Sequence, residues 1–263
     1  MLGVIRGSQA MHAGLWQQAR THRAALRSID ETMLTAAQLA PGECLLDAGC
    51  GAGASANSIA AHHEGPVIGL TLVPEQAKRA RRGGKAQFLC ADYAATPLCD
   101  ASCDVVWMLE SICHAPDKPA LLDEIVRLLR PGGRLVIADR FAARPDLSPA
   151  ERDALRSWLY PWAMPDLVTA DELIELAALA GLQLSQRTDL TLSAGPSLRF
   201  LGHFAQLTLP AALVLRALRL QSDLQIAAMR GCIAQTHTFN AGLWRYCLLR
   251  FDKPSGRISR EYT

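Results

Sequence analysis

Three glycines at alternate positions follow an aspartate in the stretch 47–53, which runs D-A-G-C-G-A-G. A short apolar run over 44–46 comes directly before this stretch, and a helical pattern over 55–63 comes directly after it. Glycines between a buried strand and a helix let the backbone approach a ligand closely, with amide groups directed at it from the helix start. The stretch 47–53 therefore predicts a cofactor-binding loop.

The glycine spacing alone does not identify the cofactor, because Gly49, Gly51 and Ala54 also satisfy the dinucleotide pattern G-x-G-x-x-G/A. Dinucleotide-binding folds place an acidic residue about 20 positions further on to hold a ribose. This chain has Thr71 there, and Asp47 at the end of the first strand would repel a pyrophosphate. A carboxylate at that position fits a cationic ligand group, such as the ammonium or sulfonium of S-adenosylmethionine.

The loop resembles the first motif of the class I S-adenosylmethionine-dependent methyltransferases, an apolar pair followed by D-x-G-x-G-x-G. The resemblance implies that Asp47 organises the methionine end of the cofactor and that Gly49 and Gly51 line it. It also implies that Asp92 and Tyr93, after the third predicted strand, flank the adenine. S-adenosyl-L-methionine is therefore the expected cofactor, and no metal is expected.

The resemblance covers residues 39–140 and departs from the commonest family pattern at the second strand. Most members carry an acid there that binds the ribose hydroxyls, whereas the stretch 69–76 has none in the strand. It looks like the G-L-T-L-S-x-x-Q stretch of the cyclopropane-fatty-acid synthases, which implies that Thr71 and Gln76 bind the ribose. We interpret Glu75 as an acidic residue in the first turn of the next helix.

The segment 110–118 follows the fourth predicted strand, at the edge where open α/β sheets bind ligands. It resembles the E-A-T-C-H-A-P motif of sterol C-methyltransferases and, more loosely, the E-S-x-x-H segment of tocopherol methyltransferases. The resemblance implies that Glu110 and His114 face the transferred methyl group, with Lys118 at the start of the next helix. A loop histidine with an ordinary structural role is an equally good interpretation of His114.

The chemistry expected of Glu110 depends on the acceptor. For a hydroxyl, an amine or an enol, Glu110 or His114 would orient the acceptor or remove its proton. For an alkene carbon, a carboxylate would stabilise the carbocation that forms. The carboxylate favours a carbon acceptor slightly, and an oxygen or nitrogen acceptor on a natural product is the alternative.

Strands that alternate with helices would bring the candidate site residues together. The expected strands cover 44–47, 66–72, 86–91, 104–109, 134–139, 182–191 and 243–251, the last of them as an edge strand. The expected helices cover 9–38, 55–63, 74–82, 118–129, 149–160 and 169–180, followed by a helical block over 196–240. This rhythm predicts a doubly wound, Rossmann-like α/β fold with a seven-stranded, mostly parallel sheet, an N-terminal helical element and a helical cap inserted before the last strand.

We expect one methyltransferase domain over 1–263 with three parts. The parts are an N-terminal helical cap over 1–40, a cofactor-binding half over 41–140 and a substrate-side half over 141–263.

Several aromatic residues fit either a hydrophobic core or an acceptor pocket. Trp16 lies in an H-x-G-x-W stretch that resembles the start of several small-molecule methyltransferases, where the N-terminal helix covers the pocket. Trp158, Tyr160 and Trp162 form a cluster beyond the fifth strand. The apolar region 199–219, with its scattered basic residues, fits a roof over the substrate or the face of a homodimer.

Composition excludes several other classes. The 263 residues carry 27 Lys and Arg against 25 Asp and Glu without a concentrated basic face, so no nucleic-acid partner is expected. The eight cysteines include no C-x-x-C pair and predict reduced thiols. The chain has no apolar run of 18 uncharged residues and no signal-peptide pattern, so we expect a cytoplasmic protein without stable membrane insertion.

The sequence therefore predicts an enzyme that transfers a methyl group to a small, apolar acceptor, such as an isoprenoid or another natural product. A nicotinamide-dependent oxidoreductase on the same fold and an inactive cofactor-binding protein are the rival interpretations. Asp47 and the lack of an acid at Thr71 argue against the first rival, and the intact loop together with Glu110 argues against the second.

Overall fold

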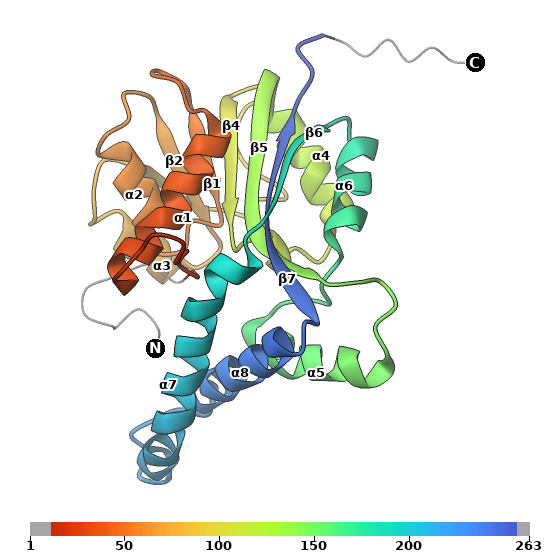
Figure 1. Cartoon of the computed structure of the whole chain (residues 1–263). Coiled ribbons are helices and arrows are strands. Elements are labelled where there is room, and N and C mark those ends of the chain that lie inside the picture. The colour runs from red at the N-terminus through yellow and green to blue at the C-terminus, as the bar shows by residue number, and fades with distance from the viewer. Residues whose placement is uncertain (1–11, 257–263) are drawn as a thin grey trace.

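The computed structural model describes residues 12–256, and in this part of the chain one sheet carries helices on both faces (Figure 1). Its strand order is β3-β2-β1-β4-β5-β7-β6. The strands are β1 (Leu45–Ala48), β2 (Val67–Thr71), β3 (Gln87–Cys90), β4 (Cys103–Leu109), β5 (Leu129–Ala142), β6 (Gln183–Asp189) and β7 (Trp244–Asp252). Neighbouring strands from β3 to β5 are parallel, and β7 is antiparallel to both β5 and β6. The predicted Rossmann-like fold with seven strands is confirmed.

Two hydrophobic clusters, one on each face, hold the helices to the sheet. The helices are α1 (His22–Ala37), α2 (Ala54–Ala60), α3 (Pro74–Ala80), α4 (Lys118–Leu128), α5 (Pro149–Leu159), α6 (Ala170–Leu179), α7 (Thr191–Ala217) and α8 (Asp223–Asn240). One cluster joins α1, α2 and α5 to the sheet, and the other joins α4 and α6 to it. Side chains from alternate positions of the strands enter opposite clusters, as expected for a sheet that is buried on both faces.

The first helix is shorter than the sequence predicts. The predicted helix over 9–38 was wrong over the described residues 12–20, which form an irregular loop, and residues 9–11 lie outside the described part. Helix α1 begins at His22 because the hydroxyl of Thr21 accepts a hydrogen bond from the N–H of Ala24 at 3.2 Å, which caps the helix. The predicted apolar face is confirmed, since Ile29 and Met33 are fully buried.

The last strand is not at the edge of the sheet. The prediction of an edge strand over 243–251 was wrong, because β7 lies between β5 and β6. The burial of the two strands gives the reason: most residues of β7 are buried, whereas most residues of β6 are exposed. The polar strand therefore forms the edge, and the apolar strand enters the interior.

The predicted cap over 196–240 is two helices that begin earlier, at Thr191. Helix α7 ends at Ala217, and α8 begins after Ser222, which forms a capping box with Gln225. The two helices form a hairpin that projects away from the sheet, below it in the view of Figure 1. The hairpin is inserted between β6 and β7, as the sequence predicts.

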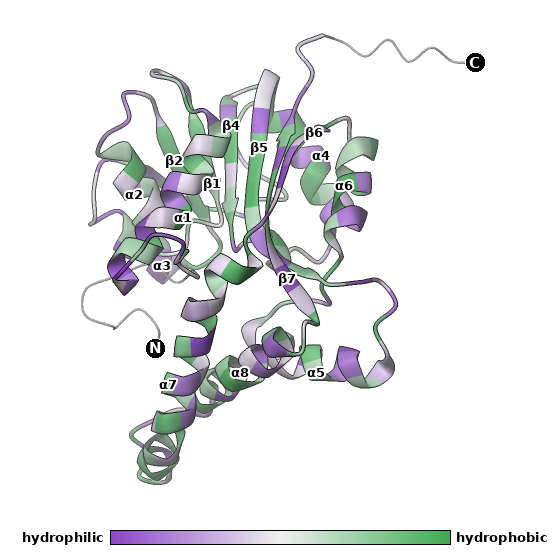
Figure 2. Cartoon of the chain, in the orientation of Figure 1, coloured by the Kyte–Doolittle hydropathy of each residue, from purple (hydrophilic) through white to green (hydrophobic). Residues whose placement is uncertain are grey.

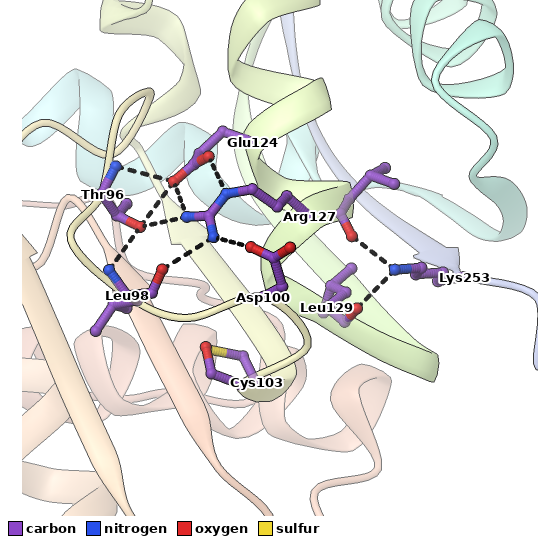
Figure 3. A network of polar contacts seen from close by, with 10 residues as sticks. Thr96, Leu98, Asp100, Cys103, Glu124, Arg127, Leu129 and Lys253 are labelled. Carbon is purple, nitrogen blue, oxygen red and sulfur yellow. Dashed lines mark hydrogen bonds and ion pairs between the residues drawn. The ribbon is translucent and has the colours of Figure 1, made fainter.

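Near the amino-terminal end of β4, a polar network connects the loop after β3 to the last turn of α4 (Figure 3). The guanidinium of Arg127 bonds to Glu124, to Asp100 and to the carbonyl oxygen of Leu98. The ammonium of Lys253 donates to the carbonyl oxygens of Val126 and Leu129, each at 2.7 Å. These contacts lie at the end of the sheet opposite the glycine loop, so their role is structural.

Candidate active site

The glycine loop leaves the carboxyl end of β1 and leads into α2. Gly49, Gly51 and Gly53 all have positive φ angles, of 96°, 53° and 78°. A Cβ atom at Gly49 would stand 2.4 Å from the Cβ atom of Ser111, and the Ser111 hydroxyl donates to the carbonyl oxygen of Ala48 at 2.6 Å. The loop between β4 and α4 therefore packs against the glycine loop, and only glycine fits at 49.

Gly51 differs from its neighbours because its missing side chain faces open space. Apart from the two chain neighbours of Gly51, no described residue lies within 4 Å of a Cβ built at this position, whereas a Cβ at Gly53 would meet Phe88 at 2.7 Å. The backbone at Gly51 is therefore open to a ligand.

Asp47 is the penultimate residue of β1, beside the glycine loop, and a second carboxyl group lies near it. Asp47 is 3% exposed. Burial, and after it the charge of Asp30 in α1, raise the pKa of Asp47 to about 8. Burial also raises the pKa of Asp30, although His12 and the hydroxyl of Ser55, which donates to Asp30 at 2.8 Å, lower it.

These two carboxyl groups fit the cationic part of S-adenosylmethionine. The buried carboxylate of Asp47 and the half-buried carboxylate of Asp30 repel each other, and neither has a basic ion-pair partner among residues 12–256. An ammonium group would stabilise both ionised carboxylates. The open space at Gly51 is on the same loop, and cofactor binding by Asp47, Gly49 and Gly51 stays a prediction.

Thr71, the last residue of β2, and Gln76 lie together at the position predicted for ribose binding. The hydroxyl of Thr71 donates to Oε1 of Gln76 at 2.8 Å. Thr71 is buried, and Gln76 is partly exposed in the first turn of α3. Glu75 is exposed in that turn, as predicted. The ribose role of Thr71 and Gln76 stays a prediction.

Asp92 and Tyr93 follow β3, one strand further from the glycine loop. Asp92 is exposed and its carboxylate accepts the N–H of Ala94 at 2.8 Å, so the side chain shapes its own turn. The hydroxyl of Tyr93 donates to the carbonyl oxygen of Ser111 at 3.1 Å. Tyr93 therefore contacts the segment that packs on Gly49, and its contact with adenine stays a prediction.

Glu110 lies at the end of β4 and has three partners. It forms an ion pair with Arg140 of β5, and both side chains are buried. The hydroxyl of Tyr246 and the N–H of Ala13 donate to Oε1 of Glu110 at 3.0 Å and 2.7 Å. The backbone of Glu110 has a φ of 48°, which is strained for a residue other than glycine. Glu110 is thus a constrained and fully bonded residue.

The ion pair fixes the charge of Glu110. Burial alone would raise the pKa of Glu110, but Arg140 and the N–H of Ala13 lower it below its usual value. Burial would favour neutral Arg140, but the charge of Glu110 raises the pKa of Arg140. Burial and the charge of Glu110 raise the pKa of Tyr246 well above its usual value. At neutral pH this cluster therefore holds a carboxylate, a guanidinium and a neutral phenol.

The loop over 12–20 closes against both the sheet and the hairpin. Its residue Ala13 bonds to Glu110, and the N–H of Gly14 donates to the hydroxyl of Ser197 in α7 at 3.0 Å. The indole N–H of Trp16 donates to the same hydroxyl at 2.8 Å. Trp16 therefore joins the N-terminal loop to the cap helix, which agrees with its predicted covering position.

Two histidines of this N-terminal region have ring nitrogens that are buried and unpaired. Nε2 of His12 and Nδ1 of His22 have no hydrogen-bond partner among the described residues. Nδ1 of His12 lies 3.1 Å from the carbonyl oxygen of Ala13. Residues 12–256 contain no group of three or more His, Cys, Asp or Glu side chains that could hold a metal ion.

His114 is exposed, with Nδ1 3.3 Å from the carbonyl oxygen of Ala163. It thus contacts the segment that carries the aromatic cluster. Trp158 of that cluster is fully buried and packs on Trp162, with ring centroids 5.9 Å apart, whereas Tyr160 is exposed. The cluster is divided between core and surface, and a catalytic role of His114 stays a prediction.

Four residues that the sequence analysis did not select belong to this region: Asp30, Arg140, Tyr246 and the ring of His12. Asp30 interrupts an otherwise apolar helix face, which was the available signal. Arg140 directly follows β5 residue Asp139 at the ligand-binding edge, and a buried arginine there signals a partner. Tyr246 gave no signal, because its contact with Glu110 depends on the antiparallel pairing of β7 with β5, which places Tyr246 opposite Arg140.

Residues 46–137 match the family model described as a methyltransferase domain. An O-methyltransferase from Pyrenophora dematioidea is 34% identical over 191 residues, which are 68% of this chain and 70% of that protein. A 24-methylenesterol C-methyltransferase 2 from Oryza sativa subsp. japonica is 31% identical over 194 residues, which are 70% of this chain but 53% of that protein.

The fold has close counterparts among solved structures. A cyclopropane synthase from Mycobacterium tuberculosis superposes with a TM-score of 0.79 at 19% identity, over 93% of this chain and 90% of that one. At this identity the likeness shows the fold alone.

Proposed function

This chain belongs to the class I S-adenosylmethionine-dependent methyltransferases, and on that basis we propose that it methylates a hydroxyl group of a small, apolar natural product. The family establishes the enzyme class and the cofactor. The acceptor atom and the roles of individual residues are the proposed part. The observation that carries the proposal is the buried, unpaired Nε2 atom of His12 beside an ion-paired Glu110.

The ring of His12 has the features of a general base. The neighbour of Nδ1 is the carbonyl oxygen of Ala13, which can only accept, so our proposal takes the tautomer with the proton on Nδ1. Nε2 therefore bears the lone pair, and it is the buried nitrogen without a partner among residues 12–256. His12 lies close enough to Asp30 and Glu110 for a positive charge on its ring, once it has taken up a proton, to lower the pKa of each carboxyl group.

Glu110 is less suited to a carbon acceptor than its position in the sequence implies. Its negative charge is compensated by Arg140 and by two further hydrogen bonds, so little of it is available to stabilise a carbocation. Its lowered pKa also makes it a weak base. The reason for preferring a carbon acceptor is therefore weakened. An oxygen acceptor agrees with the name of the similar O-methyltransferase, 70% of which aligns with this chain.

The cofactor supplies an activated methyl group, so the chain's own residues mainly provide geometry and proton transfer. In this proposal Asp47 and Asp30 bind the cationic methionine end, Gly49 and Gly51 allow backbone approach, and Thr71 with Gln76 binds the ribose. Asp92 and Tyr93 flank the adenine. Glu110 and Arg140 orient the N-terminal loop through Ala13, which brings His12 to the acceptor hydroxyl.

The test is a pH series of single-turnover rates with a phenolic acceptor, for the wild type and for His12→Gln. Loss of the base should lower the rate by about 10²–10⁴-fold near neutral pH, and the difference should shrink at high pH, where the acceptor ionises without help. His62→Gln is a matched control on an exposed ring and should keep the wild-type rate. Equal rates for His12→Gln and the wild type at every pH would overturn the assignment of His12.

A further inference from the structure

The outer half of the α7–α8 hairpin touches the body of the enzyme through Trp162, which packs against the inner side of the hairpin's core. It has its own small hydrophobic core, which includes Ala205, Ala212, Ile226, Met229 and Cys232. The inner end of α7 is held by the sheet, since the N–H of Leu190 donates to the carbonyl oxygen of Tyr246 at 2.8 Å. The outer end projects into solvent (Figure 1).

The end of this hairpin exposes an unusual amount of apolar surface. Five large apolar side chains there are 42–73% exposed, and we call them the apolar tip: Val214, Leu215, Leu218, Leu220 and Leu224. Figure 2 shows hydrophobic segments along α7 as far as this tip. Helix α7 is long and apolar enough to cross a membrane, yet only 22% of its most apolar window is buried. Exposed clusters of this kind mark interaction surfaces.

The charges of the hairpin favour an anionic partner. Residues 191–240 contain four arginines and one aspartate, with no lysine or glutamate, so their formal charge is +3 against +2 for the whole chain. Arg216 at the tip pairs with Asp223. Arg219, in the turn between the helices, has no ion-pair partner among the described residues. Apolar side chains next to arginines are typical of segments that insert into the interface of an anionic membrane.

Two other arrangements fit these observations less well. A helix that spans a bilayer would have to leave the protein, but α7 is fixed at its inner end by Leu190 and by the Ser197 contacts with Gly14 and Trp16. A second copy of the chain joined by symmetry at the tip would bring the basic hairpins together, and their like charges would repel each other. A projecting tip also suits a deformable lipid surface, which adapts to its shape.

We propose that the apolar tip inserts into the interface of a membrane that contains anionic lipids, while the sheet and the glycine loop stay outside. The leucines would be buried to a depth of about 5–10 Å, and Arg219 would lie at the level of the phosphate groups. Such docking is reversible and does not span the bilayer. It would hold the enzyme at a surface where apolar compounds collect, but binding does not depend on which acceptor atom is methylated.

Flotation of the full chain with vesicles tests this docking without any acceptor. Wild-type protein should float with vesicles of phosphatidylcholine and phosphatidylglycerol, and more weakly with phosphatidylcholine alone. The double variant Leu218→Gln/Leu220→Gln should lower the partition coefficient by about a hundredfold, because two large apolar side chains no longer insert. Leu179→Gln is a matched control, since Leu179 is 81% exposed on α6, and it should bind as the wild type does.

Arg219→Gln tests the electrostatic part separately: it should weaken binding to the anionic vesicles and leave binding to phosphatidylcholine unchanged. The tip side chains are exposed, so the double variant should keep the wild-type melting temperature and cofactor affinity. Failure of the wild type to float, or equal flotation of the double variant, would overturn the proposal. A wild-type dimer that the double variant converts to monomers, without vesicle binding by either, would assign the tip to a second copy instead.

Discussion

The charge on Asp30 raises the pKa of Asp47, although the two residues belong to different elements, α1 and β1. The N-terminal helix therefore takes part in the chemistry of the glycine loop. Burial raises the pKa of both carboxyl groups, and the charge of Asp30 raises that of Asp47 further. This relationship connects the stability of the enzyme to its cofactor.

Asp47→Asn should weaken cofactor binding without lowering the stability of the ligand-free protein. The neutral amide removes a buried carboxylate, so the ligand-free protein should melt at the same temperature as the wild type or higher. Loss of a charge-assisted hydrogen bond of about 1.5–3 kcal/mol should weaken S-adenosylmethionine binding about 10–100-fold. Calorimetry and thermal unfolding measure both effects. Asp153→Asn, on the exposed surface of α5, is the control, and unchanged affinity in Asp47→Asn would refute the role of Asp47.

Cofactor binding should release a proton near neutral pH. The pKa of Asp47 is raised from 3.8 to about 8, so its contribution to stability is full at low pH and is lost as the pH rises through 8. A cationic ligand lowers this pKa again and expels the proton. Calorimetry of S-adenosylhomocysteine binding in buffers of different ionisation enthalpy should detect this release in the wild type and a smaller release in Asp47→Asn. Equal values for the two proteins would contradict it.

Gly51→Ala should impair cofactor binding more than folding. Its Cβ atom enters open space, so the stability cost is that of a positive φ angle, about 1–2 kcal/mol. Gly242→Ala is a matched control, because this glycine has a φ of 69° and equally open surroundings. The two variants should unfold at similar temperatures, and only Gly51→Ala should lose affinity. Gly49→Ala should unfold earlier than both, because its Cβ atom collides with Ser111.

Glu110→Gln should destabilise the protein by about 3–5 kcal/mol, because it leaves the guanidinium of Arg140 buried without its ionic partner. The double variant Glu110→Gln/Arg140→Met should recover most of this loss. Glu151→Gln, which removes an exposed ion pair with Arg144, should have a small effect. Denaturant unfolding of the four proteins tests the assignment, and a stable single variant would show that the pair does not hold the N-terminal loop.

Gln76→Ala should weaken cofactor binding by about 1 kcal/mol, which is roughly fivefold, if Gln76 bonds to the ribose. Glu75→Ala changes the neighbouring exposed residue of the same turn and should leave the affinity unchanged. The reverse order of effects would give the ribose role to Glu75 instead.

The sequence predicted those features that depend on local patterns. The glycine loop, the alternation of strands and helices and the pair Thr71–Gln76 are all encoded within short segments. The irregular loop over 12–20 and the inner position of β7 depend on tertiary packing, which periodicity does not contain. The partners of Glu110 come from residues 13, 140 and 246, so neither local pattern nor the motif around Glu110 could show that its charge is compensated.

The central claim is methyl transfer to oxygen, and the position of the transferred carbon tests it most directly. The full chain is incubated with S-adenosylmethionine labelled with ¹³C in the methyl group and with a panel of apolar phenols, alcohols and alkenes of natural-product type. Proton–carbon NMR then locates the label. We expect a labelled methoxy group on a hydroxylated acceptor. A labelled methyl group on carbon, formed from an alkene, would contradict it.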